Sequence, residues 1–149
     1  MPIPPEGWGG VEHLIWNFHN QLKKDGDEVT IINTKDLHKI VNTINTDKFD
    51  AVHLHYDQYA NIIPSLQCKK KMITSHYPYL ENPEPQYVFL YDLLKNSGAH
   101  IVCLSDRIQN EFLNRGNDST NVSILPCGID VDSCLLYTSP SPRDGLLSR

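Results

Sequence analysis

The sequence has little that would take the protein into a membrane or onto a nucleic acid. It contains no apolar run of membrane-spanning length, and its first residues do not have the pattern of a signal peptide. Lys and Arg number 13 against 18 Asp and Glu, which gives a formal net charge of −5. This balance argues against a nucleic-acid partner bound by phosphate neutralisation. We therefore expect a soluble, cytoplasmic protein without a nucleic-acid partner.

The cysteines also lack the spacing of the common metal sites. The four cysteines (Cys68, Cys103, Cys127 and Cys134) show no paired metal-ligand spacing. Cys103 lies in an apolar run and is most simply a small core residue. A reduced setting is therefore favoured over a disulfide framework. The length of 149 residues and the hydrophobic content of 40% suit one globular domain.

Both ends of the sequence look foreign to such a domain. Residues 134–149 resemble the in-frame translation of a sequencing-library adapter, although a Ser/Pro-rich linker would have a similar composition. We expect residues 1–133 to be a partial domain and residues 134–149 to be a non-native tail. At the other end, no strand precedes the first glycine loop, whereas such loops normally follow a buried strand. We therefore expect the first strand to be truncated.

A glycine loop and a helix open the chain. Gly7, Gly9 and Gly10 fall within four residues, and an amphipathic pattern over 10–24 follows them. The unpaired N–H groups and the positive dipole end of such a helix form a seat for phosphate or another anion. The alternative is a tight turn that only starts the helix. Gly26 is expected to end the helix in a left-handed conformation.

Strand and helix patterns then alternate along the chain. Strands are predicted over 28–33, 51–56, 71–75, 100–104 and 122–125. Helices are predicted near 37–44, over 59–67 with a break at Pro64, over 88–96, and from the N-cap Ser105 to about 115. This order predicts an α/β, Rossmann-like fold with a mostly parallel sheet and helices on both faces.

Several polar residues are expected at the carboxyl edge of that sheet, where ligands bind in such folds. His76 directly follows a predicted strand, and its imidazole could donate to a substrate or act as a base. The alternative is a histidine bonded to nearby backbone. Tyr56, Ser105 and the glycine loop are expected at the same edge. Tyr77 could stack on a sugar or base ring, or simply anchor its loop.

His53 and His55 alternate along one predicted strand and so share a face. Zinc would need at least a third ligand, and no further cluster stands out beyond nearby Asp57. Structural roles are therefore favoured for this pair, and we expect no metal site. A nicotinamide-dinucleotide site is disfavoured, because Glu12 replaces the third glycine of that fingerprint and Asn33 the acidic residue.

The motifs together resemble the N-terminal half of family 4 glycosyltransferases, the retaining GT-B group that uses nucleotide-sugar donors. The resemblance spans residues 2 to about 132 and lies in six segments in the family's order. They are Pro-Pro-x-Gly-Trp-Gly-Gly-Val-Glu from Pro4, Asp27-Glu28-Val29-Thr30, Asp50-Ala51-Val52-His53-Leu54-His55, Thr74-Ser75-His76, Leu104-Ser105-Asp106 and Leu125-Pro126-Cys127-Gly128-Ile129-Asp130.

This resemblance implies an active site between two Rossmann-like domains. Gly9 and Gly10 would lie against the donor phosphates or the sugar, His76 would contact the transferring sugar, and Tyr77 and Ser105 would help to bind substrate. The reaction would need no metal ion or cofactor and would retain the anomeric configuration. Backbone N–H groups would stabilise charge on the leaving diphosphate.

The resemblance also has limits. Cys127 replaces the family's usual asparagine. The family's C-terminal domain, which carries most nucleotide contacts, has no counterpart in the sequence and would be the missing partner. We therefore expect these 149 residues alone to be inactive. Peripheral membrane contact stays open, since many relatives dock on membranes when the acceptor is a lipid. The alternatives are a complete, non-catalytic flavodoxin-like binding module and, less favoured, a dinucleotide oxidoreductase domain.

Overall fold

The computed structural model describes residues 2–7, 9–76 and 84–128. The chain divides into two compact units, one of Met1–Thr30 with Cys127–Arg149 and one of Ile31–Pro126. The predicted domain boundary at residue 133 and the predicted tail over 134–149 both lie outside the described residues.

The first unit contains the helix that the glycine loop predicts. Helix α1 spans Gly10–Lys24, with Gly9 as its extended N-cap. At the other end, Gly26 has a φ of 98°, a conformation that favours glycine because it has no Cβ. The Asp27 N–H then donates to the Leu22 carbonyl at 3.0 Å, which closes the helix. The predicted left-handed cap at Gly26 is confirmed.

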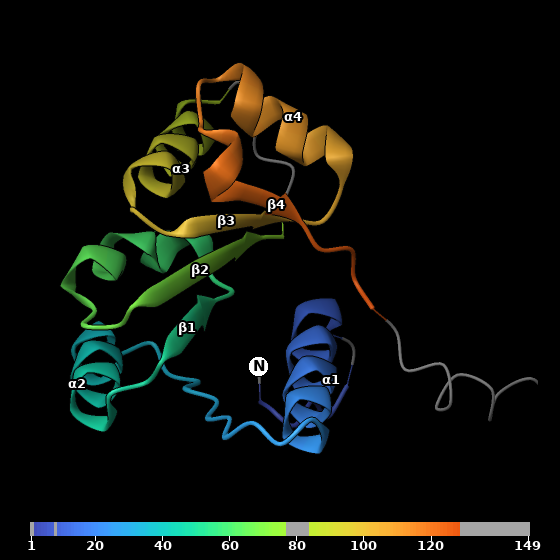
Figure 1. The fold of residues 1–149 in the computed structure, drawn as a ribbon, viewed down its shortest axis with the longest axis vertical. Coiled ribbons are helices and arrows are strands. Elements are labelled where there is room, and N and C mark those ends of the chain that lie inside the picture. The colour runs from blue at the N-terminus through green and yellow to red at the C-terminus, as the bar shows by residue number, and fades with distance from the viewer. Residues whose placement is uncertain (1, 8, 77–83, 129–149) are drawn as a thin grey trace, which may run out of the picture. The chain divides into compact units, whose positions relative to one another are not determined.

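The second unit is built on a parallel sheet. In the described residues the sheet has four strands in the order β1-β2-β3-β4, all parallel (Figure 1). The strands are β1 (Ala51–Leu54), β2 (Lys70–Ser75), β3 (His100–Cys103) and β4 (Val122–Ile124). The helical segments are α2 (Leu37–Asp47), η1 (Asp57–Ser65), α3 (Pro85–Asn96), α4 (Asp106–Asn114) and η3 (Ser119–Asn121). The predicted α/β, Rossmann-like class is confirmed.

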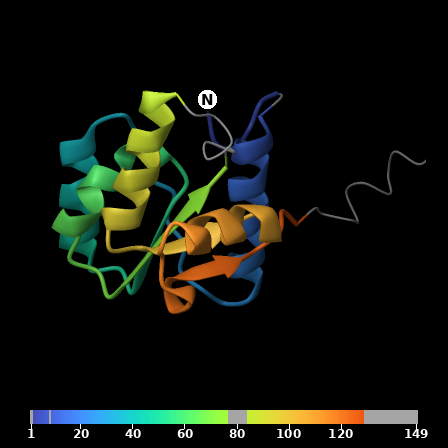
Figure 2. The same cartoon turned by 90° about the horizontal axis from the view of Figure 1, so that it is seen from above.

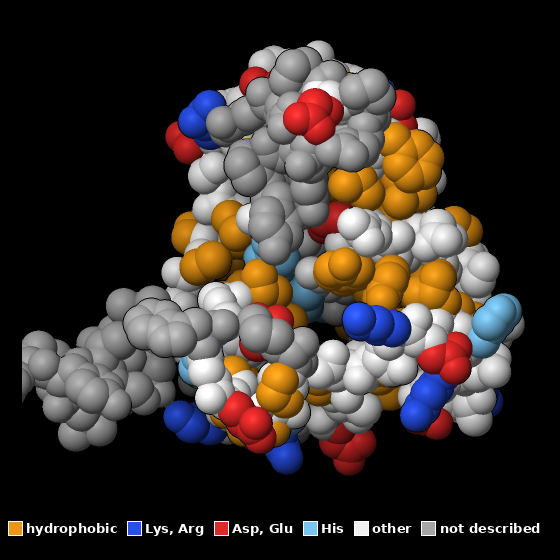
Figure 3. Space-filling view, turned by 180° about the vertical axis from the view of Figure 1, so that it is seen from behind, with side chains coloured by type: hydrophobic (Ala, Val, Ile, Leu, Met, Phe, Trp, Pro, Cys, Tyr) orange, Lys and Arg blue, Asp and Glu red, His pale blue; other side chains and the backbone are white. Residues whose placement is uncertain are grey.

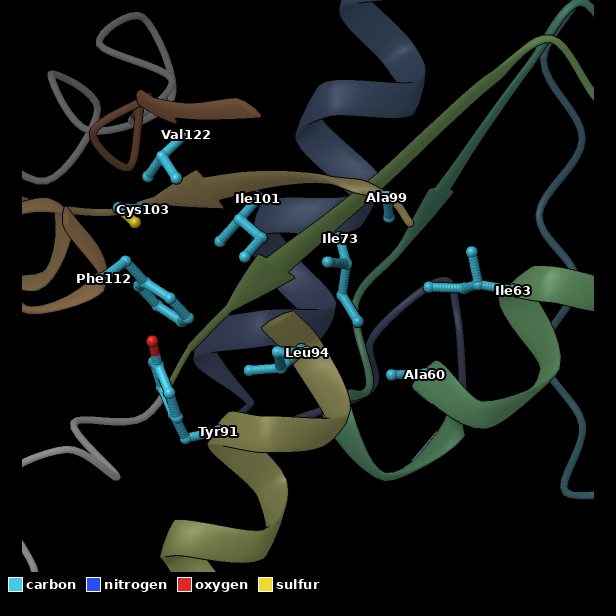
Figure 4. Packing of buried hydrophobic residues seen from close by; sticks show 10 residues of the cluster. All are labelled: Ala60, Ile63, Ile73, Tyr91, Leu94, Ala99, Ile101, Cys103, Phe112 and Val122. Carbon is cyan, nitrogen blue, oxygen red and sulfur yellow. The ribbon is translucent and has the colours of Figure 1, made fainter. Parts of the chain in front are cut away.

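The order of the strands decides where their connections lie. Because the strands follow one another in one direction, right-handed crossovers place η1, α3 and α4 on the same side of the sheet, as Figures 1 and 2 show. Between them and the sheet lies the main hydrophobic core, in which Phe112 of α4 meets Tyr91 of α3 at 5.3 Å between ring centroids (Figure 4). The strands contribute Ile73 and Ile101, both almost fully buried.

A smaller apolar cluster joins α2 to η1. The buried side chains of Ile40 and Ile44 pack there with Ile62 and Leu66. Asp36 begins α2 by accepting from the Lys39 N–H at 3.0 Å, an N-cap that ties the helix start to a polar side chain.

Two predicted elements differ in the structure. Residues 28–33 form no strand, because a strand needs a hydrogen-bonded neighbour and none pairs with this segment in the described part of the chain. The helix predicted over 59–67 is instead the 3₁₀ segment η1, with Pro64 inside it. The segment begins and ends two residues earlier than predicted and has the tighter i→i+3 hydrogen bonds of a 3₁₀ helix.

Candidate functional site

Three polar residues lie at the carboxyl edge of the sheet in the second unit. His55 directly follows β1, His76 follows β2, and Ser105 lies just beyond β3. Since the three strands are parallel neighbours, their carboxyl ends share one edge. The expected placement of His76 and Ser105 at a common edge therefore agrees with the structure.

His55 and His76 also contact each other. His53 and Met72 are register partners, so Thr74 and His76 lie on the same face as His53 and His55. The Nδ1 atom of His55 is 3.1 Å from Nε2 of His76, within hydrogen-bond distance. The two rings are stacked at 5.4 Å between centroids.

His53 extends this arrangement along the strand. Its ring lies 4.1 Å from that of His55, centroid to centroid, and its Nε2 is 2.6 Å from the Thr74 hydroxyl oxygen. The result is a row of three imidazoles, His53, His55 and His76, with Thr74 at its inner end. We call it the histidine row.

The environment keeps the inner two members of the histidine row neutral. Burial, followed by the charge of His76, lowers the pKa of His53 from 6.5 to about 4. Burial, followed by the charges of His53 and His76, lowers the pKa of His55 from 6.5 to about 3. Both rings are therefore uncharged near neutral pH, and each can donate one hydrogen bond and accept another.

The nearby carboxylate of Asp57 belongs to the other side of the sheet. The Ser75 hydroxyl donates to Asp57 Oδ2 at 3.4 Å, and both residues are buried. Ser75 alternates with Thr74 and His76, so its side chain lies on the opposite face. Within the described ranges, no group of three or more His, Cys, Asp or Glu side chains could hold a metal ion.

Ser105 caps a helix. Its hydroxyl oxygen accepts from the Ile108 N–H at 3.4 Å at the start of α4, which confirms the predicted N-cap. A hydroxyl that accepts one bond still has a second lone pair and a proton, so capping and substrate binding are chemically compatible.

The remaining predicted contacts lie elsewhere in the chain. Gly9 and Gly10 belong to the first unit, where α1 begins without a hydrogen bond from a capping side chain. A Cβ added at Gly10 would meet open space. Tyr77 lies outside the described residues.

The sequence motifs did not predict the contact between His55 and His76. They indicated His53 and His55 as a structural pair and His76 as a separate candidate. The available signal was their spacing. Histidines at alternating positions share a face, and a third histidine directly after the next parallel strand lies near the same end of that face.

The surface chemistry adds two facts. On the face shown in Figure 3, Lys and Arg side chains lie beside Asp and Glu side chains, so charges of both signs are interspersed. None of the helices in the described residues combines the length and the apolar character that a membrane span requires.

Residues 33–133, more than half of the chain, match the sequence model of Glycosyltransferase Family 4. The chain belongs to that family. The matched range includes the histidine row and the capping Ser105, and it confirms the resemblance found in the sequence motifs. This glycosyltransferase domain matches no curated protein and no solved structure in the same comparisons.

Proposed function

We propose that the carboxyl edge of the sheet forms the sugar-binding side of a retaining glycosyltransferase that uses a nucleotide-sugar donor. In this proposal His76 contacts the transferring sugar and Ser105 lies near it. Gly9, Gly10 and Tyr77 complete the substrate contacts. The observation that carries the proposal is the position of His76, at the carboxyl end of a parallel strand within the range matched to the family.

The chemistry of the edge supports a carbohydrate ligand. Sugar hydroxyls both donate and accept hydrogen bonds, and neutral imidazoles do the same. Burial keeps His53 and His55 neutral near pH 7, so the row offers polar groups without a fixed charge. In parallel α/β sheets, ligands bind beyond the carboxyl ends of the strands.

A sugar titration tests this proposal directly. The ¹⁵N-labelled chain is titrated with glucose, galactose, mannose and N-acetylglucosamine, and the ring resonances of each histidine are followed. We expect the His76 resonances to move with a saturable dependence on at least one sugar. His100 is the internal control, because it begins β3 at the opposite edge and bonds to the Ser123 hydroxyl at 2.9 Å.

Two outcomes would contradict the proposal. One is a saturable response of His100 without any response of His76. The other is that the ring resonances of His76 do not change with any of the sugars, whether free or as the nucleotide sugar.

The donor side of the reaction is also part of the proposal. We infer that backbone N–H groups at the start of α1 help to stabilise charge on the leaving diphosphate, in place of a metal ion. A UDP-sugar or GDP-sugar titration should then give the same affinity with and without EDTA. Binding of the nucleotide sugar that requires added Mg²⁺ or Mn²⁺ would refute the proposal that the reaction needs no metal ion.

We further propose that residues 1–149 alone do not turn over substrate, because the resemblance places most nucleotide contacts on a second domain. Release of nucleoside diphosphate from a panel of nucleotide sugars should stay at the buffer rate. Turnover above that rate, removed by His76→Ala, would overturn this expectation. A cytoplasmic location, suggested by the cysteine usage, belongs to the same proposal.

A further inference from the structure

The ring of His55 contacts the rings of both His76 and His53. Its Nδ1 lies 3.1 Å from Nε2 of His76, and its ring lies 4.1 Å from that of His53 between centroids, at an interplanar angle of 36°. His53 is in turn held by the Thr74 hydroxyl. The imidazole of His55 therefore contacts His53 and also forms a hydrogen bond with His76, the candidate sugar-contacting residue.

When both imidazoles are neutral, a hydrogen bond between them links their tautomers. Only one of the two facing nitrogens can carry the proton. If His55 Nδ1 donates, then His76 holds its proton on Nδ1. If His55 Nδ1 accepts, then His76 holds its proton on Nε2. The bond therefore determines whether the far nitrogen of His76 is a donor or an acceptor.

We propose that His55 is a positioning residue, whose Nδ1 holds the His76 ring in one orientation and one tautomer for the sugar. This rests on the proposed function of His76. The neutral state of His55 near pH 7, which follows from its burial, supports the proposal because a charged His55 could only donate.

The hydrogen bond itself can be measured in the unmodified chain. A ¹⁵N–¹⁵N coupling across the bond should connect His55 Nδ1 with His76 Nε2. The ring ¹⁵N shifts should also show one dominant tautomer for His76. Sharp signals from both nitrogens without any coupling would overturn the proposal, and this readout needs no variant.

Substitutions separate the hydrogen bond from packing. His55→Asn keeps a polar atom near the position of Nδ1, whereas His55→Leu removes it. We expect His55→Leu to change the tautomer ratio of His76 and His55→Asn to restore most of the wild-type ratio. His38→Asn is the matched control, on an exposed residue of α2. Equal ratios in wild type and His55→Leu, or equal changes in both His55 variants, would refute the positioning role.

The sugar titration completes the test. We expect His55→Leu to raise the dissociation constant for the responding sugar roughly 3- to 10-fold, as for the loss of one neutral hydrogen bond. His55→Asn should recover most of that loss. Equal affinities in wild type and His55→Leu would overturn the proposal for His55 alone. A wild-type His76 that responds to no sugar would instead overturn the proposed function, while the coupling still decides whether the bond exists.

Discussion

The partly buried His53 and His55 make the stability of the fold depend on pH. In the folded chain the pKa of His53 is about 4 and that of His55 about 3, against 6.5 in the absence of the fold. The unfolded state therefore binds more protons than the folded state below pH 6.5. Above pH 6.5 the two rings are neutral in both states, so they do not lower the free energy of unfolding. It falls as the pH drops from 6.5 towards 4 for His53 and towards 3 for His55.

The magnitude near pH 5.5 depends little on the folded-state pKa values. At about one unit below 6.5, an unfolded histidine is roughly nine-tenths protonated, whereas both folded rings stay neutral. Each ring then costs about 1.4 kcal/mol of unfolding free energy relative to about pH 7.5, and the two together cost about 3 kcal/mol.

Urea unfolding at these two pH values measures the effect. His53→Gln and His55→Asn keep polar atoms near the bonded ring nitrogens but cannot take up a proton. Each should reduce the pH dependence of the unfolding free energy by about 1.4 kcal/mol. The exposed His38 is the control, and His38→Asn should leave most of that dependence in place. If His53→Gln and His55→Asn both keep the full wild-type pH dependence, the two rings are not buried as neutral groups.

Four further outcomes follow from the packing and the caps. Ser105→Ala removes the N-cap of α4 and should cost about 1 kcal/mol in urea unfolding, which Ser105→Asp should largely avoid. Phe112→Ala opens the main core and should cost about 3–5 kcal/mol, and a loss below that of Phe112→Leu would contradict the packing. Gly26→Ala should destabilise α1 by about 1 kcal/mol, because φ is 98° there, and an unchanged circular dichroism melt would argue against that cap. In thiol labelling the exposed Cys127 should react quickly. Cys103 should react only on unfolding, because it is buried and burial raises its pKa to about 11.

Local signals in the sequence were enough to predict most helices and their ends. As expected, α1 begins after the glycine loop and ends before Gly26, and Ser105 caps α4. These features depend on backbone groups within one turn of the chain, so neighbouring residues decide them. The start of α3 at Pro85 rather than residue 88 follows the same logic, since proline suits the first turn.

The errors involve partners that are distant in the sequence. The segment 28–33 has the composition of a strand, but composition does not supply a neighbour to pair with. Likewise, the contact between His55 and His76 depends on the register of β1 against β2, which no single-segment pattern specifies. The sequence indicated that His76 and Ser105 lie at one edge of the sheet, and the register determined which side chains meet there.

The most direct test of the central claim is a crystal structure of the chain soaked with a nucleotide sugar. Our account predicts electron density for the sugar at the carboxyl edge of β1 and β2, within hydrogen-bond distance of the His76 ring. Density for the sugar at the opposite edge, beside His100, with none near His76, would contradict it.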